Sequence, residues 1–281
     1  MLPADLPGIL LALTSAFIWG AGDFSGGFAS RRDNQYKVLA LAALSGTVVL
    51  LAAAVVRGES LPSPVSALWA MLAGVSGALG LAALYRGLSL GHAASVAPTA
   101  AVIGAVLPVV FSGFVEGLPS MTRLAGFALA CLGIWLVSQT AAQDIEISRV
   151  GFSLACLAGA GFGGFFIFIA QVEQGTVFTP FIVTRCTTLC VALVLLRIRR
   201  LPWGSTTPNS VALVAGVLDS GGNVFYLLAK QATRLDVAAV LSSLYPASTV
   251  LLSCILLKER VTRTQWLGVA VCLAAIAFIT L

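Results

Sequence analysis

Long apolar runs follow one another through almost the whole chain and restrict what it can fold into. Ten of them approach or exceed the length of about 20 residues that a helix needs to cross the hydrocarbon core of a bilayer. They span residues 6–29, 36–56, 65–86, 93–115, 121–139, 150–170, 177–197, 209–229, 235–257 and 264–281. They lack the short alternating segments of membrane β-barrels. The sequence therefore predicts an all-α membrane protein with ten transmembrane helices.

The composition excludes an ordinary soluble enzyme. Only 10% of the 281 residues are charged and 59% are hydrophobic, whereas soluble domains carry about 25% charged residues. No Ser-His-Asp set, HExxH motif or Gly-rich phosphate loop is present, so we expect no enzymatic activity and no cofactor. The cysteines fall within apolar runs without metal-ligand spacing, and we interpret them as small core residues and expect no metal. They are Cys131, Cys156, Cys186, Cys190, Cys254 and Cys272.

The two halves of the chain are related by an internal repeat. A shift of 141–143 residues places Trp19 on Phe162 and Gly74 on Gly216. Each copy contains five spans, and an odd number of spans reverses the second copy in the membrane. We therefore expect two inverted-topology repeats, residues 1–142 and 143–281. Carriers with this architecture bind solute near the bilayer midplane, where the copies meet, and expose the site to each side in turn.

Several short motifs resemble a known family. They are Trp19-Gly20, Ser242-Ser243-Leu244-Tyr245-Pro246, Leu256-Leu257-Lys258-Glu259-Arg260-Val261-Thr262 and Gln265-Trp266-Leu267-Gly268, with a weaker first-half copy in Glu116-Gly117-Leu118. Together they resemble the EamA-type repeat of the drug/metabolite transporter superfamily. The resemblance implies a multi-pass transporter in the inner or plasma membrane of a bacterium. It is specific for the fold and for transport, but not for the solute.

The basic residues are distributed unevenly among the loops. Of the 16 lysines and arginines, 11 fall in odd-numbered loops and 4 in even-numbered loops. The positive-inside rule then places both termini outside, whereas the family resemblance implies that both lie inside, so the orientation stays open. Because the net charge of +5 is spread over short loops, we expect contact with lipid headgroups and not with nucleic acid.

Three charged residues lie well inside the apolar runs, where each costs about 2.5–3.5 kcal/mol. Asp23 stands where Phe166 stands in the second copy, and is either a site for a proton or a solute amine, or a structural carboxylate. Asp219 shares a helix face with Asn223, and the two either line a cavity or join helices. Arg185 either binds a solute carboxylate, extends its charged end toward the membrane surface, or neutralises Asp23 or Asp219.

Other residues are candidates for the cavity wall or for helix packing. Trp19 and Phe162 occupy one repeat position and either stack on the solute or pack in the core. Ser243 and Tyr245 precede Pro246, which is predicted to break the ninth span and free carbonyls for the cavity; Pro98 is predicted to do the same in the fourth. Tyr85 and Tyr226 are predicted to anchor at the membrane interface.

Two pairs of glycines at four-residue spacing favour close helix packing. Gly22 and Gly26 lie in the first span, and Gly159 and Gly163 lie in the sixth. Here the close packing also suits helices that slide against each other during transport.

These features together favour a secondary transporter, and the resemblance favours an exporter. We expect it to carry small amphipathic metabolites such as amino acids by alternating access, without ATP. A proton-coupled exporter of cationic drugs and a lipid flippase or scramblase are the alternatives. The expected partners are a small-molecule solute and the lipid bilayer, with protons as candidate coupling ions. The sequence leaves a monomer and a homodimer equally open.

Overall fold

The computed structural model describes residues 5–30, 33–89, 93–139, 149–198, 200, 209–258 and 261–280. Throughout these residues the regular structure is helical, and its bounds confirm the predicted spans. The helices are α1 (Leu6–Ser30), α2 (Gln35–Arg57), α3 (Pro64–Ser89), α4 (Ala93–Val115), α5 (Met121–Val137), α6 (Arg149–Ile169), α7 (Phe178–Ile198), α8 (Ser210–Ala232), α9 (Leu235–Ser242), α10 (Tyr245–Leu257) and α11 (Arg263–Thr280). The predicted repeat boundary at residue 142 lies outside the described residues.

The described helices have the length and polarity of membrane spans. Nine segments are long and apolar enough to cross a bilayer, and α9 and α10 together form one of them, Leu235–Leu256. The tenth, α5, has 17 residues and is about 26 Å long at 1.5 Å per residue. Large apolar side chains such as Val56, Leu68 and Val194 are exposed on the outside of the bundle, as expected for a surface that faces lipid.

Several helix ends are fixed by their own sequence. Ser120 precedes α5, and its side chain accepts a hydrogen bond from the backbone N–H of Arg123 at 3.3 Å. Thr262 does the same for Gln265 at the start of α11, at 3.2 Å. Such caps satisfy backbone donors that have no partner in the first turn of a helix. The two caps occupy equivalent positions in the two halves.

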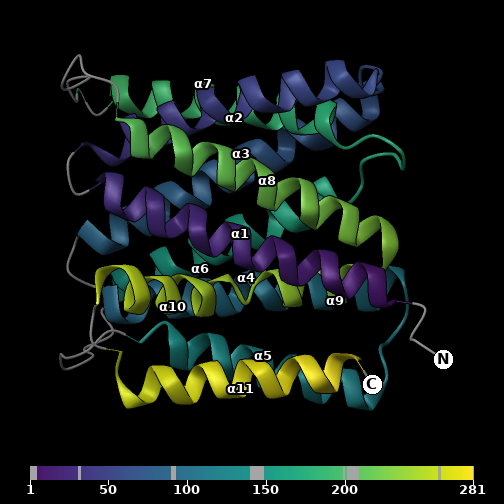
Figure 1. Cartoon of the computed structure of the whole chain (residues 1–281), viewed down its shortest axis with the longest axis vertical. Helices are drawn as coiled ribbons and strands as arrows, with labels where there is room; N and C mark the ends of the chain where they lie inside the picture. Colours follow the sequence, from purple (N-terminus) through teal and green to yellow (C-terminus); the bar gives the residue numbers. More distant parts are fainter. Residues whose placement is uncertain are drawn as a thin grey trace.

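The helices run side by side, and α1 begins at the same end of the bundle at which α11 ends (Figure 1). We call this end, which includes Glu59, Glu116 and Arg234, the N/C end. The opposite end, which includes Asp33 and Asn209, is the far end. The connections α2–α3, α4–α5, α6–α7 and α8–α9 therefore lie at the N/C end.

The main helix contacts join one half of the chain to the other. In the first half, α1 packs against α8, α9 and α10; in the second half, α6 packs against α3 and α4. In the same way, the contact of α2 with α8 corresponds to the contact of α7 with α3. The contacts of α2 with α7 and of α5 with α11 each join two equivalent helices, so the symmetry maps each of these contacts onto itself. This pattern is that of two inverted five-helix repeats related by a pseudo-two-fold axis.

Glycines at the helix crossings follow the same symmetry. A Cβ on Gly74 of α3 would stand 2.7 Å from the carbonyl oxygen of Thr184 of α7, and a Cβ on Gly216 of α8 would overlap the backbone of Ala42 of α2. Each residue of the second contact is 142 positions from its mate in the first. Since only glycine fits at these positions, the repeat is preserved where two backbones approach most closely.

The predicted break in the ninth span is confirmed, whereas the break predicted at Pro98 and the core position predicted for two of the cysteines are wrong. The ninth span is interrupted, because α9 ends at Ser242 and α10 begins at Tyr245. In contrast, α4 continues through Pro98, since helices in membranes tolerate proline where neighbouring groups satisfy the freed carbonyl. Cys186 and Cys190 are exposed on α7 and are not core residues, because apolar character alone does not distinguish the lipid-facing side of a membrane helix from its buried side.

Candidate functional site

An ion pair inside the bundle joins α7 to α8. The guanidinium of Arg185 contacts the carboxylate of Asp219. Arg185 is only 5% exposed, whereas the Asp219 side chain is 41% exposed. The pairing offsets the cost of placing these two charges at membrane depth. In this arrangement the Arg185 guanidinium neutralises the charge of Asp219.

Asp23 lies on α1 beside this ion pair. A Cβ on the preceding Gly22 would stand 3.3 Å from the backbone nitrogen of Asp219, so α1 and α8 cross closely at this point. The carboxylates of Asp23 and Asp219 are near enough to interact electrostatically. Asp23 is exposed, and within the described part of the chain it forms no ion pair. Its carboxyl group is therefore accessible from outside the bundle and has no basic partner among the described residues.

Aromatic side chains pack around Trp19 next to the two aspartates. The Trp19 ring is stacked on Tyr226 with centroids 5.9 Å apart, and it contacts Phe166 at 5.6 Å and the edge of Tyr245 at 6.4 Å. Its indole N–H donates to the side-chain oxygen of Asn223 at 3.2 Å. The cluster thus joins α1, α6, α8 and α10.

The prediction that Tyr226 anchors at the membrane interface is wrong. This side chain is 0% exposed, and its hydroxyl donates to the carbonyl oxygen of Phe166 at 3.0 Å. The residue lies near the predicted end of its span, but α8 continues to Ala232. Tyr226 consequently packs in the interior. The side chain of Tyr85, its mate in the repeat, lies outside the described part of the structure.

The remaining cavity candidates are placed in different surroundings. Asn223 and Ser243 are buried, and the Ser243 hydroxyl donates to the carbonyl of Ala239 at 2.7 Å. Phe162 packs against Gly104 of α4, in a cluster separate from that of Trp19. The structure therefore brings together Asp23, Asp219, Arg185, Trp19, Asn223 and Tyr245, and leaves Phe162 apart.

The glycine pairs lie at the helix crossings next to the site. Gly22 and Gly26 face α8, while Gly159 and Gly163 face α4. The pair on α6 is the tighter one, since a Cβ on Gly159 would stand 2.9 Å from the carbonyl oxygen of Ala100. Pro246 is the second residue of α10.

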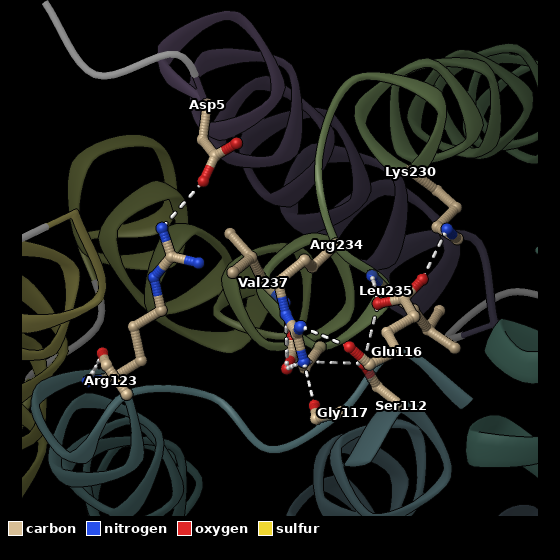
Figure 2. Close-up of polar contacts among 11 residues, drawn as sticks. Asp5, Ser112, Glu116, Gly117, Arg123, Lys230, Arg234, Leu235 and Val237 are labelled. Atoms are coloured by element: carbon tan, nitrogen blue, oxygen red, sulfur yellow. Dashed lines mark hydrogen bonds and ion pairs between the residues drawn. The ribbon is translucent and has the colours of Figure 1, made fainter. Parts of the chain in front are cut away.

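A second group of charges, at the N/C end, did not follow from the sequence. Glu116 accepts hydrogen bonds from Lys230 at 2.9 Å, from Ser112 at 2.8 Å and from the backbone N–H of Leu235 at 3.0 Å. Figure 2 shows this arrangement, together with Arg234 beside Gly117. The sequence did indicate Glu116-Gly117, because these residues belong to the family motif. The order of residues along the chain does not indicate which basic side chains lie close to Glu116 in the fold.

Hydrogen bonding alters the ionisation of these loop carboxylates. Burial disfavours the charged form of Glu116, but the hydrogen bonds from Lys230, Ser112 and Leu235 outweigh it and lower the pKa of this carboxyl below its usual range. Burial likewise opposes ionisation of Glu59, and hydrogen bonds from Thr179, Phe178 and Val177 lower its pKa. Both groups therefore carry a negative charge at neutral pH.

The inverted repeats and the charged side chains between them define a multi-pass membrane protein of the transporter class. The model of the EamA-like transporter family matches residues 6–139 and 149–281. The match covers both repeats, and the chain belongs to this family.

The other comparisons add the fold alone. Among 29 matching chains of solved structures, one crystal structure covers 96% of this chain and 95% of its own, with a TM-score of 0.73 and 18% sequence identity. No curated protein matches this chain. Within the described residues, no group of three His, Cys, Asp or Glu side chains is placed to bind a metal ion.

Proposed function

We propose that this protein is a secondary transporter for small amphipathic solutes that carry an ammonium group. The observation that carries the proposal is the asymmetry among the three charges in the bundle. Arg185 is buried and paired with Asp219, while Asp23 is exposed and has no ion-pair partner among the described residues. When both aspartates are ionised, the three side chains together carry one net negative charge, which a solute cation compensates.

The surroundings of Asp23 suit the apolar part of such a solute. Tyr245 is partly exposed and belongs to the aromatic cluster around Trp19. Aromatic faces attract ammonium groups and organic cations. Helix crossings at Gly22 and Gly163, without side chains to interlock, permit the relative movement that alternating access requires.

An amino acid is a second candidate, and a different observation favours it. The Nε of Arg185 is buried and has no hydrogen-bond partner among the described residues, which is unusual for a charged group. A solute carboxylate that reached Arg185 would satisfy this nitrogen, while the solute amine faced Asp23. The amine is common to both candidates, and the carboxylate distinguishes them.

Three solutes with the same phenyl ring separate these possibilities: phenyltrimethylammonium, phenylalanine and phenylpropionate. Purified protein in liposomes is loaded with unlabelled solute, and counterflow of the labelled solute is measured. We expect counterflow of the cation, none of the anion, and loss of counterflow in Asp23→Asn. The matched control, Asp5→Asn, removes a carboxylate at the N/C end and retains counterflow. Equal transport of the anion, or full activity of Asp23→Asn, would refute the proposal.

The zwitterion candidate has its own readout. Arg185→Lys keeps the positive charge but removes Nε. If Arg185 binds the carboxylate of phenylalanine, this variant reduces the counterflow of phenylalanine and leaves the counterflow of phenyltrimethylammonium unchanged. If both solutes are affected equally, Arg185 acts only through Asp219.

A further inference from the structure

Polar bonds join the two halves of the chain at the N/C end of the bundle. One group, which we call the N/C cluster, consists of Ser112, Glu116, Lys230, Arg234 and Asp236. It joins the α4–α5 connection of the first half to the α8–α9 connection of the second half. The lengths of its bonds are 2.6–3.4 Å.

Arg234 is the centre of this cluster. Its guanidinium donates to both oxygens of Asp236, at 2.8–3.2 Å, and Asp236 is 0% exposed. The same guanidinium donates across to the backbone carbonyl of Glu116 at 3.0 Å and to that of Gly117 at 2.6 Å, as Figure 2 shows for Gly117. Charge-assisted hydrogen bonds of this kind are about twice as strong as neutral ones. Because Asp236 holds Arg234 in place, the α4–α5 connection is bound by a preorganised group.

A second tie lies at the same end. Glu59, between α2 and α3, accepts hydrogen bonds from the backbone N–H groups of Val177, Phe178 and Thr179 at 2.7–3.2 Å. These donors form the first turn of α7, where a carboxylate is most favourable. Ser63 also donates to Glu173 at 2.6 Å. All four helix connections at the N/C end are therefore bound in pairs across the two halves.

Asp23 lies nearer the far end. It stands seven residues before the last residue of α1, about 10 Å from the far end at 1.5 Å per residue, and it is exposed. Gly27, one turn further on, is also exposed and has nothing within 4 Å of where a Cβ would be. Asp23 is therefore exposed on the part of α1 nearer the far end, whereas the connections at the N/C end are bound to one another across the two halves.

The sequence repeat shows that the two ends are not held by the same residues. A shift of 142 positions places Lys230 on Leu88 and Asp236 on Ala94. Arg234 falls on His92 under the same shift, and Glu116 falls on Lys258. Among the described residues of the far end, Asn209 of the second half donates to the carbonyl oxygen of Ala29 at 3.2 Å and to the carboxylate of Asp33 at 3.1 Å, both in the first half. Different residues therefore join the two halves at the two ends.

We propose that the N/C cluster is a gate that holds the protein closed at the N/C end, and that its bonds must break before Asp23 is exposed to that side. The Glu116 carboxylate is the residue on which the cluster depends, since it links Lys230 of α8, the first turn of α9 and Ser112 of α4. The proposal rests on the alternating access of the proposed function. It requires no particular solute.

Hydrogen–deuterium exchange on the full chain in nanodiscs, without solute, tests the gate. Glu116→Gln keeps the shape of the side chain and removes its charge. We expect amides of the α4–α5 and α8–α9 connections to exchange about tenfold faster, since hydrogen bonds to charged groups contribute about 1.5–3 kcal/mol. We also expect amides at the end of α1 and the start of α8 to exchange more slowly, because closure of the far end accompanies opening of the N/C end.

The matched control is Arg123→Gln. Arg123 and Asp5 form an ion pair of similar length and exposure at the same end, 2.7 Å with 23% and 32% of the side chains exposed, but both residues belong to the first half. This variant should leave both ends unchanged. If Glu116→Gln does not fold, Lys230→Gln replaces it, since Lys230 is at the surface of the cluster.

The slower exchange at the far end is the decisive result. Faster exchange confined to the mutated connections would make the cluster a local structural contact and overturn the proposal, as would no change at either end. Because no solute is present, failure of this experiment leaves the assignment of the ammonium site to Asp23 untouched, and failure of the counterflow experiment leaves the gate untouched.

Discussion

Removing Arg185 should cost more stability than removing Arg123, whose ion pair with Asp5 is exposed. Arg185→Met leaves the Asp219 carboxylate without its counter-ion at membrane depth. Breaking one side of a fully buried ion pair costs about 3–5 kcal/mol. Because 41% of the Asp219 side chain is exposed, water stabilises part of its charge, and we expect a loss of about 2–3 kcal/mol in the free energy of unfolding.

A double-mutant cycle isolates the ion pair. Adding Asp219→Asn to Arg185→Met removes the unpaired charge, so the double variant should lie within about 1 kcal/mol of the original protein. Unfolding in mixed micelles with rising amounts of SDS, followed by circular dichroism, measures all four proteins. Arg123→Met, which breaks the exposed pair with Asp5, should cost no more than about 1 kcal/mol.

The cycle refutes the reasoning if the two single costs simply add. Additivity would mean that the contact between Arg185 and Asp219 contributes nothing, and that each side chain is stabilised by other groups. It would also free Arg185 to bind a solute carboxylate, and thereby favour the amino acid over the simple cation.

Two further results are expected. Gly216→Ala should lower the free energy of unfolding by about 1–3 kcal/mol, because its Cβ would overlap α2, whereas Gly27→Ala, with open space at its Cβ, should be neutral or slightly stabilising by the same SDS titration. The pKa of Glu116 lies below its ordinary value of 4.5, so the stability that its ionised carboxylate contributes is present above pH 4.5 and is lost as the pH falls through the lower folded-state pKa. The difference in the free energy of unfolding between the original protein and Glu116→Gln should therefore shrink in acid. A difference that stays constant with pH would contradict the assigned shift.

The sequence was sufficient for the helices and their symmetry. Apolar length defined each span to within a few residues, and Pro246 marked the division between α9 and α10. Pro98 and Tyr226 were misjudged for a related reason. Their effects depend on which neighbours surround them, and the position of a residue along its own span does not reveal whether a carbonyl or a ring is satisfied by another helix.

The charges illustrate the same limit. Asp23, Arg185 and Asp219 were recognisable from the sequence because charge within an apolar run is costly. Which of them pair was undecided, since α7 and α8 pack only a small part of their lengths together. Glu116 and Arg234 were less visible still. They lie 118 positions apart in polar connections, where charge is ordinary and only the fold brings the two together.

The contact between α5 and α11 has a consequence for how such a chain arose. Gly126 of α5 meets Ile279 of α11, and Gly268 of α11 meets Val137 of α5, so each surface meets its own equivalent. Contacts of this form are the mark of an isologous interface between two identical subunits. A five-helix ancestor that dimerised in antiparallel fashion would have used this same interface. Joining two copies of its gene would release each half to diverge, which is consistent with Asp23 in one half standing where Phe166 stands in the other.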